Sequence, residues 1–464
     1  MRKEHDFLGE LEIADDIYYG VQTLRAVQNF DISGQRIKDF PKFIVAFAQV
    51  KKAAALANNE LGLLSNEIKD AICFACDELI AGKYKDQFVV DMIQGGAGTS
   101  TNMNANEVIA NIALEKMGHK KGEYKYCHPN DNVNLSQSTN DAYPTALHIA
   151  VHDYLSDLIK SMEYLKNAFN KKAVEFKDVI KMGRTQLQDA VPMTLGREFS
   201  AFAQMLEQDI ARLKSSQSEC LEMNMGATAI GTGINSHPDY AKTVEKYLQQ
   251  ITGNKYYTAS DLIRATPDTG VFVEVSGTLK RIATKLSKVC NDLRLLGSGP
   301  KCGLAEINLP KMQPGSSIMP GKVNPVIPEV VNQVCYYVIG ADVTVAFACE
   351  GGQLQLNVFE PVAAYSVLNS ICMLDRAMMT LATKCVEGIS ANEKICKDFV
   401  LNSVGIVTAL NPFIGYENSA SIAKEALATG KRVYDLVLER NLMDKAKLDK
   451  ILSPEFMLSP RMGE

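Results

Sequence analysis

Four polar clusters rich in Ser, Thr, Asn and Gly interrupt the chain, and each precedes an apolar, helix-like pattern. The clusters are Gln94–Asn104, Gln137–Asp141, Gly183–Pro192 and Gly315–Pro325. The start of a helix presents free N–H groups and the positive end of the helix dipole, so hydroxyl and amide side chains placed there are suited to hold an anion such as a carboxylate. The same residue types also favour ordinary helix capping, which is the simpler interpretation of any one cluster taken alone.

The loop from Pro314 to Pro328 has the most unusual composition in the chain. Four prolines and two glycines exclude regular structure from it and also restrict its shapes. Its polar side chains are Ser316, Ser317, Lys322 and Asn324. A mobile lid that brings Ser316 and Lys322 to a substrate fits this composition, whereas a plain connector would not need so polar a core.

Metal and nucleotide sites find little support in the other motifs. Cys73 and Cys76 have the spacing of zinc ligands, but they lie in a helical pattern and no second pair completes four ligands. His148 and His152 lack the glutamate of a zinc-protease helix motif. Two glycine-containing segments that are similar to nucleotide-binding loops depart from those patterns at a required position. We therefore expect no metal site.

Long amphipathic helices must position the four clusters. Apolar residues recur with the helical period over 144–176, 199–221 and 279–296, which predicts a helix over each range. Between 330 and 347 the chain is apolar on nearly every side, as a helix is when other helices surround it in a bundle or at a subunit interface. The short runs 13–21 and 88–93 are compatible with strands or buried turns, but no alternation of strands and helices suggests a parallel sheet. The expected fold is all-α.

Composition narrows the range of partners. The chain has 464 residues, is 46% hydrophobic and carries a formal net charge of -5, so it can bury a large core in several compact units. No long run of Lys or Arg offers a surface for nucleic acid or a membrane. A charged N-terminus without an apolar signal segment, and eleven cysteines that we interpret as reduced thiols, favour a cytoplasmic location. Small molecules and copies of the chain itself are the expected partners.

The loop 315–325 resembles the signature of the fumarase/aspartase superfamily. Within that superfamily the chain is most similar to the aspartate ammonia-lyases, through segments 15–26, 326–335, 350–361 and 405–415. The resemblance implies a mainly helical fold in three domains and a homotetramer whose active sites draw loops from three subunits. The domains it implies are an N-terminal domain at 1–140, a central long-helix bundle at 141–395 that carries the signature loop and forms the tetramer core, and a small C-terminal domain at 396–464.

The activity that the resemblance implies is the reversible elimination of ammonia from L-aspartate to give fumarate. In this family pattern Ser316 is the general base that removes the proton next to the β-carboxylate. The residues implied to hold that carboxylate as it becomes a dianionic aci-carboxylate are Thr99, Ser138, Thr139 and Ser317. Those implied to bind the α-carboxylate are Thr185, Lys322 and Asn324, and Asn140 is expected near the amino group.

The chemistry requires such a set of donors, because loss of a proton from an unactivated carbon is feasible only if the charge arriving on the carboxylate meets preorganised groups. A serine is a weak base at its ordinary pKa, so Ser316 needs a nearby cation or backbone N–H groups to ionise it, and Lys322 is a candidate. The resemblance implies no required cofactor, and it leaves activation by a divalent cation such as Mg²⁺ open.

Gln186 is a departure, because many relatives carry His at this position. The His–Glu pair of fumarases, which Glu329 would complete, is therefore not expected. An ammonium group leaves as neutral ammonia, whereas the hydroxyl of malate leaves better with a proton donor, so we interpret Gln186 as a neutral substrate contact. The alternatives are a fumarate hydratase acting on malate and fumarate, and a non-catalytic helical oligomer. The intact Ser316 and Lys322 argue against the second.

Overall fold

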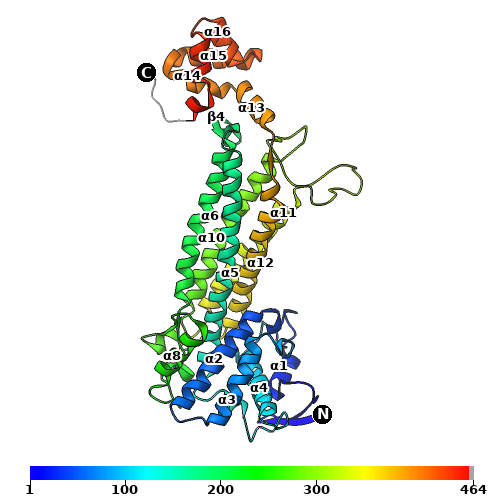
Figure 1. Ribbon diagram of the computed structural model, residues 1–464, viewed down its shortest axis with the longest axis vertical. Helices are drawn as coiled ribbons and strands as arrows, with labels where there is room; N and C mark the ends of the chain where they lie inside the picture. Colours follow the sequence, from blue (N-terminus) through cyan, green and yellow to red (C-terminus); the bar gives the residue numbers. More distant parts are fainter. Residues whose placement is uncertain (459–464) are drawn as a thin grey trace. The chain divides into compact units, whose positions relative to one another are not determined.

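The computed structural model describes residues 1–458, and this part of the chain is mainly helical, as the sequence predicts (Figure 1). Two compact units divide it. The first comprises Met1–Lys160, Ala211–Ala283 and Tyr336–Asp375, and the second comprises Ser161–Ile210, Thr284–Cys335 and Arg376–Glu464. Because both units combine separate segments of the chain, they do not test the division into three consecutive domains, which stays a prediction.

Five long helices contribute residues to both units. They are α5 (Thr139–Glu175), α6 (Leu195–Glu219), α10 (Gly270–Leu296), α11 (Val326–Glu350) and α12 (Glu360–Lys384). The periodicity over 144–176, 199–221 and 279–296 is therefore confirmed as three of these helices, α5, α6 and α10. Pro144 lies inside α5 near its start, where few intrahelical bonds are lost to a residue without an N–H group.

The remaining helices of the first unit surround the N-terminal clusters. They are α1 (Val21–Asn29), α2 (Pro41–Glu60), α3 (Asn66–Ile80), α4 (Thr99–Lys116), α7 (Thr228–Gly231), α8 (Tyr240–Thr252) and α9 (Leu262–Ala265). Helix α2 packs against α3 and α8, and α3 packs against α4 (Figure 1). Cys73 and Cys76 lie in α3 as free thiols, and burial raises the pKa of both. Cys76 is buried and Cys73 is half-buried, so the interpretation as a core residue is confirmed for Cys76.

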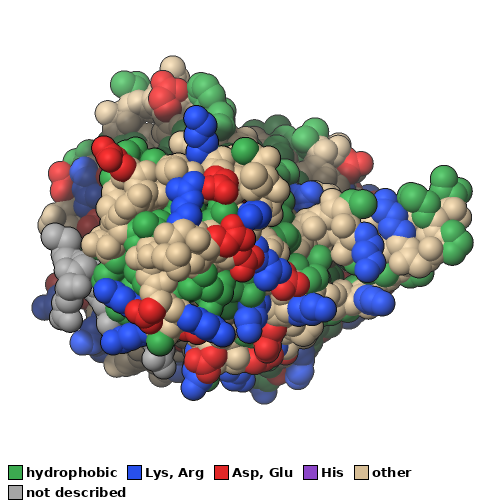
Figure 2. Space-filling view, turned by 90° about the horizontal axis from the view of Figure 1, so that it is seen from above, with side chains coloured by type: hydrophobic (Ala, Val, Ile, Leu, Met, Phe, Trp, Pro, Cys, Tyr) green, Lys and Arg blue, Asp and Glu red, His purple; other side chains and the backbone are tan. Residues whose placement is uncertain are grey.

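Short helices also dominate the C-terminal part of the second unit. They are α13 (Glu393–Asn402), α14 (Val407–Ile414), α15 (Tyr416–Thr429), α16 (Val433–Glu439), α17 (Lys445–Ile451) and α18 (Pro454–Met457). Their apolar residues form a buried cluster that also includes Met182 of β3. Figure 2 shows Lys, Arg, Asp and Glu side chains interspersed on the face that it displays.

The strands within residues 1–458 form four two-stranded sheets. Three are antiparallel: β1 (Arg2–Asp6) with β2 (Gly9–Ile13), β3 (Ile180–Thr185) with β4 (Gln188–Thr194), and β7 (Ile307–Asn308) with β8 (Ser390–Ala391); the parallel pair is β5 (Glu222–Met223) with β6 (Tyr257–Thr258). Of the short runs noted in the sequence, 13–21 only touches the end of β2. The run 88–93 contains one isolated bridge, from Asp91 to Arg36, and both runs are otherwise mostly irregular, so neither forms a strand of its own.

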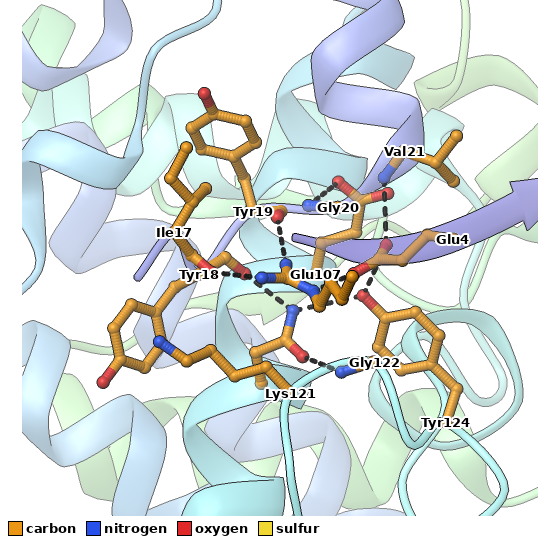
Figure 3. A network of polar contacts seen from close by, with 12 residues as sticks. Glu4, Ile17, Tyr18, Tyr19, Gly20, Val21, Glu107, Lys121, Gly122 and Tyr124 are labelled. Atoms are coloured by element: carbon orange, nitrogen blue, oxygen red, sulfur yellow. Dashed lines mark hydrogen bonds and ion pairs between the residues drawn. The ribbon is translucent and has the colours of Figure 1, made fainter. Parts of the chain in front are cut away.

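A polar network fixes the N-terminal segment to α4 (Figure 3). The buried Glu107 carboxylate accepts hydrogen bonds from the backbone N–H groups of Gly20, Gln22 and Thr23 at 2.8, 2.9 and 3.1 Å, and from the Thr23 hydroxyl at 2.6 Å. A Cβ atom on Gly20 would lie 2.5 Å from a Glu4 carboxylate oxygen, so only glycine fits between the two carboxylates. Burial raises the pKa of Glu107 to about 7. The network holds α4, whose first residue is Thr99.

Helix α11 confirms the apolar segment that the sequence shows at 330–347. Within the described residues it is the one helix that is long and apolar enough to cross a membrane, judged by length and composition alone. A single helix of this kind is weak evidence for a membrane span, because core helices of soluble proteins have the same length and composition. Only 28% of its most apolar window is buried inside the chain, which leaves a large apolar face uncovered.

Candidate active site

Thr99 is the first residue of α4, and an unusual turn places it there. Three consecutive residues before it, Gly96, Ala97 and Gly98, have positive φ angles of 91°, 55° and 87°. A Cβ atom on Gly98 would lie 2.3 Å from the ring of Tyr143 in α5, so glycine is required for the turn to approach that helix. The Thr99 side chain is exposed, and its hydroxyl donates to the Gly96 carbonyl at 2.8 Å.

The segment from Ser138 to Asp141 begins α5 with a reciprocal cap. The Ser138 hydroxyl accepts from the N–H of Asn140 at 3.2 Å, and the Asp141 carboxylate accepts from the N–H of Ser138 at 2.9 Å. Asp141 is fully buried and also accepts from the N–H of Gly226 at 3.0 Å; burial raises its pKa to about 6. The helix starts at Thr139, inside the polar cluster that the sequence places before this helical pattern.

Hydrogen bonds hold both the side chain and the backbone of Asn140. Its side-chain Nδ2 donates to the Ala229 carbonyl at 2.7 Å, and its backbone carbonyl accepts from Nδ2 of Asn224 at 2.9 Å. Ala229 has a φ of 54°, which is unusual for a residue with a side chain, so the bond from Asn140 meets a constrained turn. The Asn140 side chain is thus fixed in one orientation at the beginning of α5.

Lys51 joins the first two clusters, and sequence reasoning missed it. From α2, its fully buried Nζ donates to side-chain oxygens of Asn102, Asn134 and Gln137 at 2.7, 2.9 and 2.9 Å. Nδ2 of Asn102 then donates to the Thr139 hydroxyl at 3.2 Å. Burial lowers the pKa of Lys51 to about 7. Its only sequence signal is a lysine placed on the apolar, alanine-rich face of a helix.

The cluster Gly183–Pro192 forms a hairpin. Its candidate site residues therefore do not lie at the start of a helix, contrary to the expectation from the sequence. Thr185 ends β3, and the turn residues Gln186 and Leu187 both have positive φ angles, 53° and 63°. This is the geometry of a tight hairpin turn. Thr185 and Gln186 are exposed at the tip, while α6 begins only at Leu195.

Ion pairs and apolar contacts fix the base of this hairpin. Glu306 is fully buried and pairs with Arg184 at 2.7 Å and with Lys181 at 2.9 Å. Lys181 also pairs with Glu198 of α6 at 2.6 Å. Helix α13 packs on β3 as well. The exposed tip that carries Thr185 and Gln186 therefore stands on a rigid base.

The loop 315–325 lacks regular structure, as predicted, but its own hydrogen bonds close it. The N–H of Gly315 donates to the Lys322 carbonyl at 2.7 Å, and Nδ2 of Asn324 donates to the Gly315 carbonyl at 2.8 Å. A Cβ atom on Gly315 would lie 2.7 Å from that Lys322 oxygen, so the closure requires glycine. The side chains of Ser317 and Lys322 are exposed, and Ser316 and Asn324 are half-buried.

The Ser316 hydroxyl oxygen accepts two backbone hydrogen bonds. The donors are the N–H groups of Ile318 and Met319, at 3.2 and 3.1 Å. Donors aimed at an oxygen favour its ionised form. Of the two aids to ionisation considered from the sequence, the backbone groups are therefore in contact with Ser316.

The structure thus assembles the predicted residues into three groups. Thr99, Ser138, Thr139 and Asn140 belong to one hydrogen-bonded region of the first unit. The second unit holds the hairpin pair at 185–186 and the loop that carries Ser316, Ser317, Lys322 and Asn324. Within the described residues no group of three or more His, Cys, Asp and Glu side chains is arranged to hold a metal ion.

Comparisons with known proteins agree over the length of the chain. A family model described as Lyase matches residues 9–340, and one described as Fumarase C C-terminus matches residues 406–459. The aspartate ammonia-lyase of Helicobacter pylori (strain ATCC 700392 / 26695) is 66% identical over 460 residues, which cover 99% of this chain and 98% of that protein. The aspartate ammonia-lyase of Escherichia coli (strain K12) is 54% identical over 461 residues, covering 99% and 96%.

Solved structures share the fold. The structure described as a fumarate lyase:delta crystallin from Brucella melitensis bound to cobalt has a TM-score of 0.97 and 53% identity, and covers 99% of this chain and 100% of that chain. A recombinant class II fumarase from Schistosoma mansoni has a TM-score of 0.93 at 35% identity, with 98% of each chain covered.

Proposed function

We infer that this chain, which belongs to the Lyase family, is an aspartate ammonia-lyase, a carbon–nitrogen lyase that eliminates ammonia from L-aspartate to give fumarate. The observation that carries the inference is the identity of 54% and 66% to two aspartate ammonia-lyases over nearly the whole of each chain. The class II fumarase structure is 35% identical over a similar length. The mechanism proposed for this activity rests on the site residues and their contacts.

Ser316 is the proposed general base. Its ionised oxygen takes the proton from C3 of aspartate, and the electron pair of that C–H bond moves onto the β-carboxylate to give the aci-carboxylate. Collapse of this intermediate forms the C2–C3 double bond and breaks the C2–N bond, whose electron pair leaves with the protonated amino group as neutral ammonia. The N–H groups of Ile318 and Met319, which already bond the hydroxyl, stabilise the negative oxygen before the proton arrives.

The β-carboxylate gains a second negative charge in this step, and hydroxyl groups at helix starts are proposed to receive it. Thr99 stands at the start of α4, and Ser138 and Thr139 stand at the start of α5, where free N–H groups and the helix dipole favour an anion. Ser317 adds a hydroxyl from the loop. Because the Lys51 network holds the two helix starts together, these donors are preorganised.

The α-carboxylate is assigned to Lys322, Asn324 and Thr185. An exposed ammonium group and two neutral donors suit a carboxylate that keeps its charge throughout the reaction. Asn140 is assigned to the amino group, and Gln186 at the hairpin tip supplies a neutral contact. No cofactor is required by this scheme; a divalent cation such as Mg²⁺ would act as an activator.

The active enzyme is proposed to be a homotetramer whose sites each draw loops from three subunits. The apolar face of α11 supports the assembly, because monomeric proteins rarely leave so large an apolar area uncovered. Its exposed side chains are Val330, Tyr336, Tyr337, Val343 and Phe347. The eleven cysteines, which all lie in the described residues and are free, support a reducing, cytoplasmic location.

The function is tested by following the ultraviolet absorbance of fumarate. Purified protein receives L-aspartate in one cuvette and L-malate in a second. A rise with aspartate alone is the expected result. A rise with malate alone would make the protein a fumarate hydratase. An unchanged absorbance in both cuvettes would indicate another substrate or a structural role.

A further inference from the structure

A polar cavity lies in the first unit, and none of the predicted site residues lines it. Its volume is about 310 Å³, room for roughly ten water molecules. The surrounding segments are α5, the end of α6, β5, β6, α9 and the starts of α10 and α12. The polar side chains that matter for the argument are Thr145, Glu222, Asn224, Arg264, Asp268 and Glu360.

Three buried polar groups of this cavity lack partners. Glu360 is 4% exposed, and among the described residues its carboxylate makes neither a hydrogen bond nor an ion pair. Oγ1 of Thr145 and Oδ1 of Asn224 are likewise buried without a hydrogen-bond partner in the described part of the chain. Burying such groups without a hydrogen-bond partner is unfavourable. All three groups belong to residues that line the cavity and can accept hydrogen bonds, so a ligand with several donors would suit them.

The charge of the cavity selects a cation. Glu222 and Asp268 line it together with Glu360, and the one cationic side chain in the lining, Arg264, already pairs with both Glu222 and Asp268. Nδ1 of His148 meets the Glu222 carbonyl at 2.7 Å, and burial lowers the pKa of this histidine, so its ring stays neutral. The lining is therefore negative, and burial alone raises the pKa of Glu360 to about 8 because nothing positive faces it.

A cation with N–H donors fits better than a metal ion. The described residues contain no group of three or more His, Cys, Asp and Glu side chains placed to coordinate a metal. One carboxylate, one amide oxygen and one hydroxyl form instead a set of hydrogen-bond acceptors for an ammonium group.

Asn224 connects this cavity to the proposed active site. Its Nδ2 donates to the carbonyl of Asn140 at 2.9 Å, while its Oδ1 is one of the unpartnered acceptors. Under the proposed function Asn140 lies near the amino group that leaves as ammonia. One side chain thus touches both the site of ammonia release and the cavity.

We propose that this cavity binds an ammonium ion, the protonated form of the reaction product, through N–H donation to Glu360, Asn224 and Thr145. That the ion comes from the reaction rests on the proposed function. Its binding does not, because the cavity and its unpartnered acceptors are present without substrate. Primary alkylammonium ions and K⁺ share part of this chemistry, and the experiment separates them.

The test measures the melting temperature of the full-length protein without aspartate or fumarate, near pH 8, in chloride salts of equal ionic strength. The salts are those of ammonium, methylammonium, potassium and tetramethylammonium, the last of which has no N–H group. Ammonium is expected to raise Tm by about 2 °C or more at saturation, with a hyperbolic dependence on concentration, and tetramethylammonium to leave it unchanged. An equal rise with potassium would overturn the assignment to ammonium, and no rise with ammonium would overturn the site.

Matched variants locate the effect. Glu360→Gln keeps the shape of the side chain and removes its charge, and it should weaken ammonium binding at least ~10-fold. Glu219→Gln removes the same charge from an exposed residue of the same cavity, and a change of less than ~2-fold is expected. Ser316→Ala should lose activity and keep the ammonium response, which separates failure of this proposal from failure of the proposed function. Equal weakening by both glutamate variants would overturn the role of Glu360.

A crystal of the unaltered protein provides a readout that does not depend on folding of a variant. Thallium(I) is close in size to ammonium, and its anomalous signal should appear between Glu360, Asn224 and Thr145 and disappear when ammonium chloride is added. A cavity that stays empty of thallium, or a thallium peak that ammonium does not displace, would overturn the proposal.

Discussion

Ser316 is the residue on which the proposed mechanism depends most directly. Its hydroxyl accepts hydrogen bonds but does not contribute to the closure of the loop, which rests on Gly315, Lys322 and Asn324. Ser316→Ala should therefore remove the base and keep the loop closed, and we expect kcat to fall at least ~10²-fold. The measurement is initial fumarate formation from L-aspartate, with sedimentation to confirm the assembly.

Ser317→Ala is the control for this prediction. It removes a neighbouring hydroxyl assigned to substrate binding, so it should cost less, about 10-fold in kcat/KM. Near-normal turnover by the Ser316→Ala protein would remove Ser316 as the base, whatever the control shows.

The raised pKa of Glu360 predicts how the stability of the protein depends on pH. Its pKa in the folded chain is about 8, above the ordinary value of 4.5, so the folded state binds the proton more tightly than the unfolded state. The contribution of this group to stability is complete below pH 4.5 and is lost as the pH rises through 8. Glu360→Gln has no proton to lose. The Tm of the variant should therefore rise relative to that of the unaltered protein as the pH increases from 5 to 9.

The comparison is made by thermal unfolding in buffers free of ammonium and other primary amines. Glu219→Gln, which changes an exposed carboxylate, should show no such trend with pH. A difference in Tm between Glu360→Gln and the unaltered protein that is constant from pH 5 to 9 would contradict the raised pKa.

At the scale of elements, Lys51 links helix α2 to the starts of α4 and α5. Lys51→Met would leave the amide oxygens of Asn102 and Gln137 without a donor, at a cost of about 1 to 3 kcal/mol for each unsatisfied group, and would free Asn102 from its position beside Thr139. The Asn134 oxygen keeps donors from Asn102 and Asn106. We expect a clear loss of stability in urea and a rise of at least ~10-fold in KM for aspartate.

The adjacent lysine offers a matched control. Lys52 lies on the same helix and pairs with Asp77 of α3, whose side chain is 55% exposed. Such partly exposed pairs contribute about 0 to 1 kcal/mol, so Lys52→Met should change stability little and KM not at all. Equal effects of the two substitutions would show that Lys51 has no special role in positioning the helix starts.

The sequence predicted the long helices well and the hairpins poorly. The period of apolar residues is a direct consequence of helix geometry, so it predicts α5, α6 and α10, although α10 begins at Gly270, nine residues before the predicted range. The turn at Gln186 and Leu187 uses positive φ angles without the Gly or Asn that usually signals them, so no local pattern marked the hairpin. Lys51 was missed because a lone lysine normally indicates an exposed position, and its three partners lie far along the chain.

At the scale of the whole molecule, the sequence identified an apolar segment but not what covers it. An apolar helix in a bundle and one at a subunit interface have the same composition, so the pattern over 330–347 could not distinguish them. The structure shows that its own chain buries only 28% of the apolar window. The motifs of the site had the same limit: they named candidate residues but not whether one chain or several chains provide them.

The assembly can be tested through α11 itself. Phe347 is 73% exposed, so Phe347→Glu should leave the fold of the subunit unchanged while placing a charge in the proposed interface. We expect sedimentation velocity to show dissociation of the tetramer and the loss of activity to follow it. Leu427→Glu, at a residue of α15 that is 76% exposed, is the control and should remain an active tetramer. A dissociated but fully active Phe347→Glu protein would contradict sites built from several subunits.

Mixed tetramers test the sharing of sites more directly. Ser316→Ala and Thr139→Ala are each expected to lower the activity of every site in a tetramer made of one variant, because every site uses both groups. If these groups come from different subunits, a tetramer assembled from both variants contains some sites with Ser316 and Thr139 intact. Unfolding and refolding the two variants together should therefore raise the activity above that of either variant refolded alone. Absence of recovery in mixtures that sediment as tetramers would place both groups of a site on one subunit.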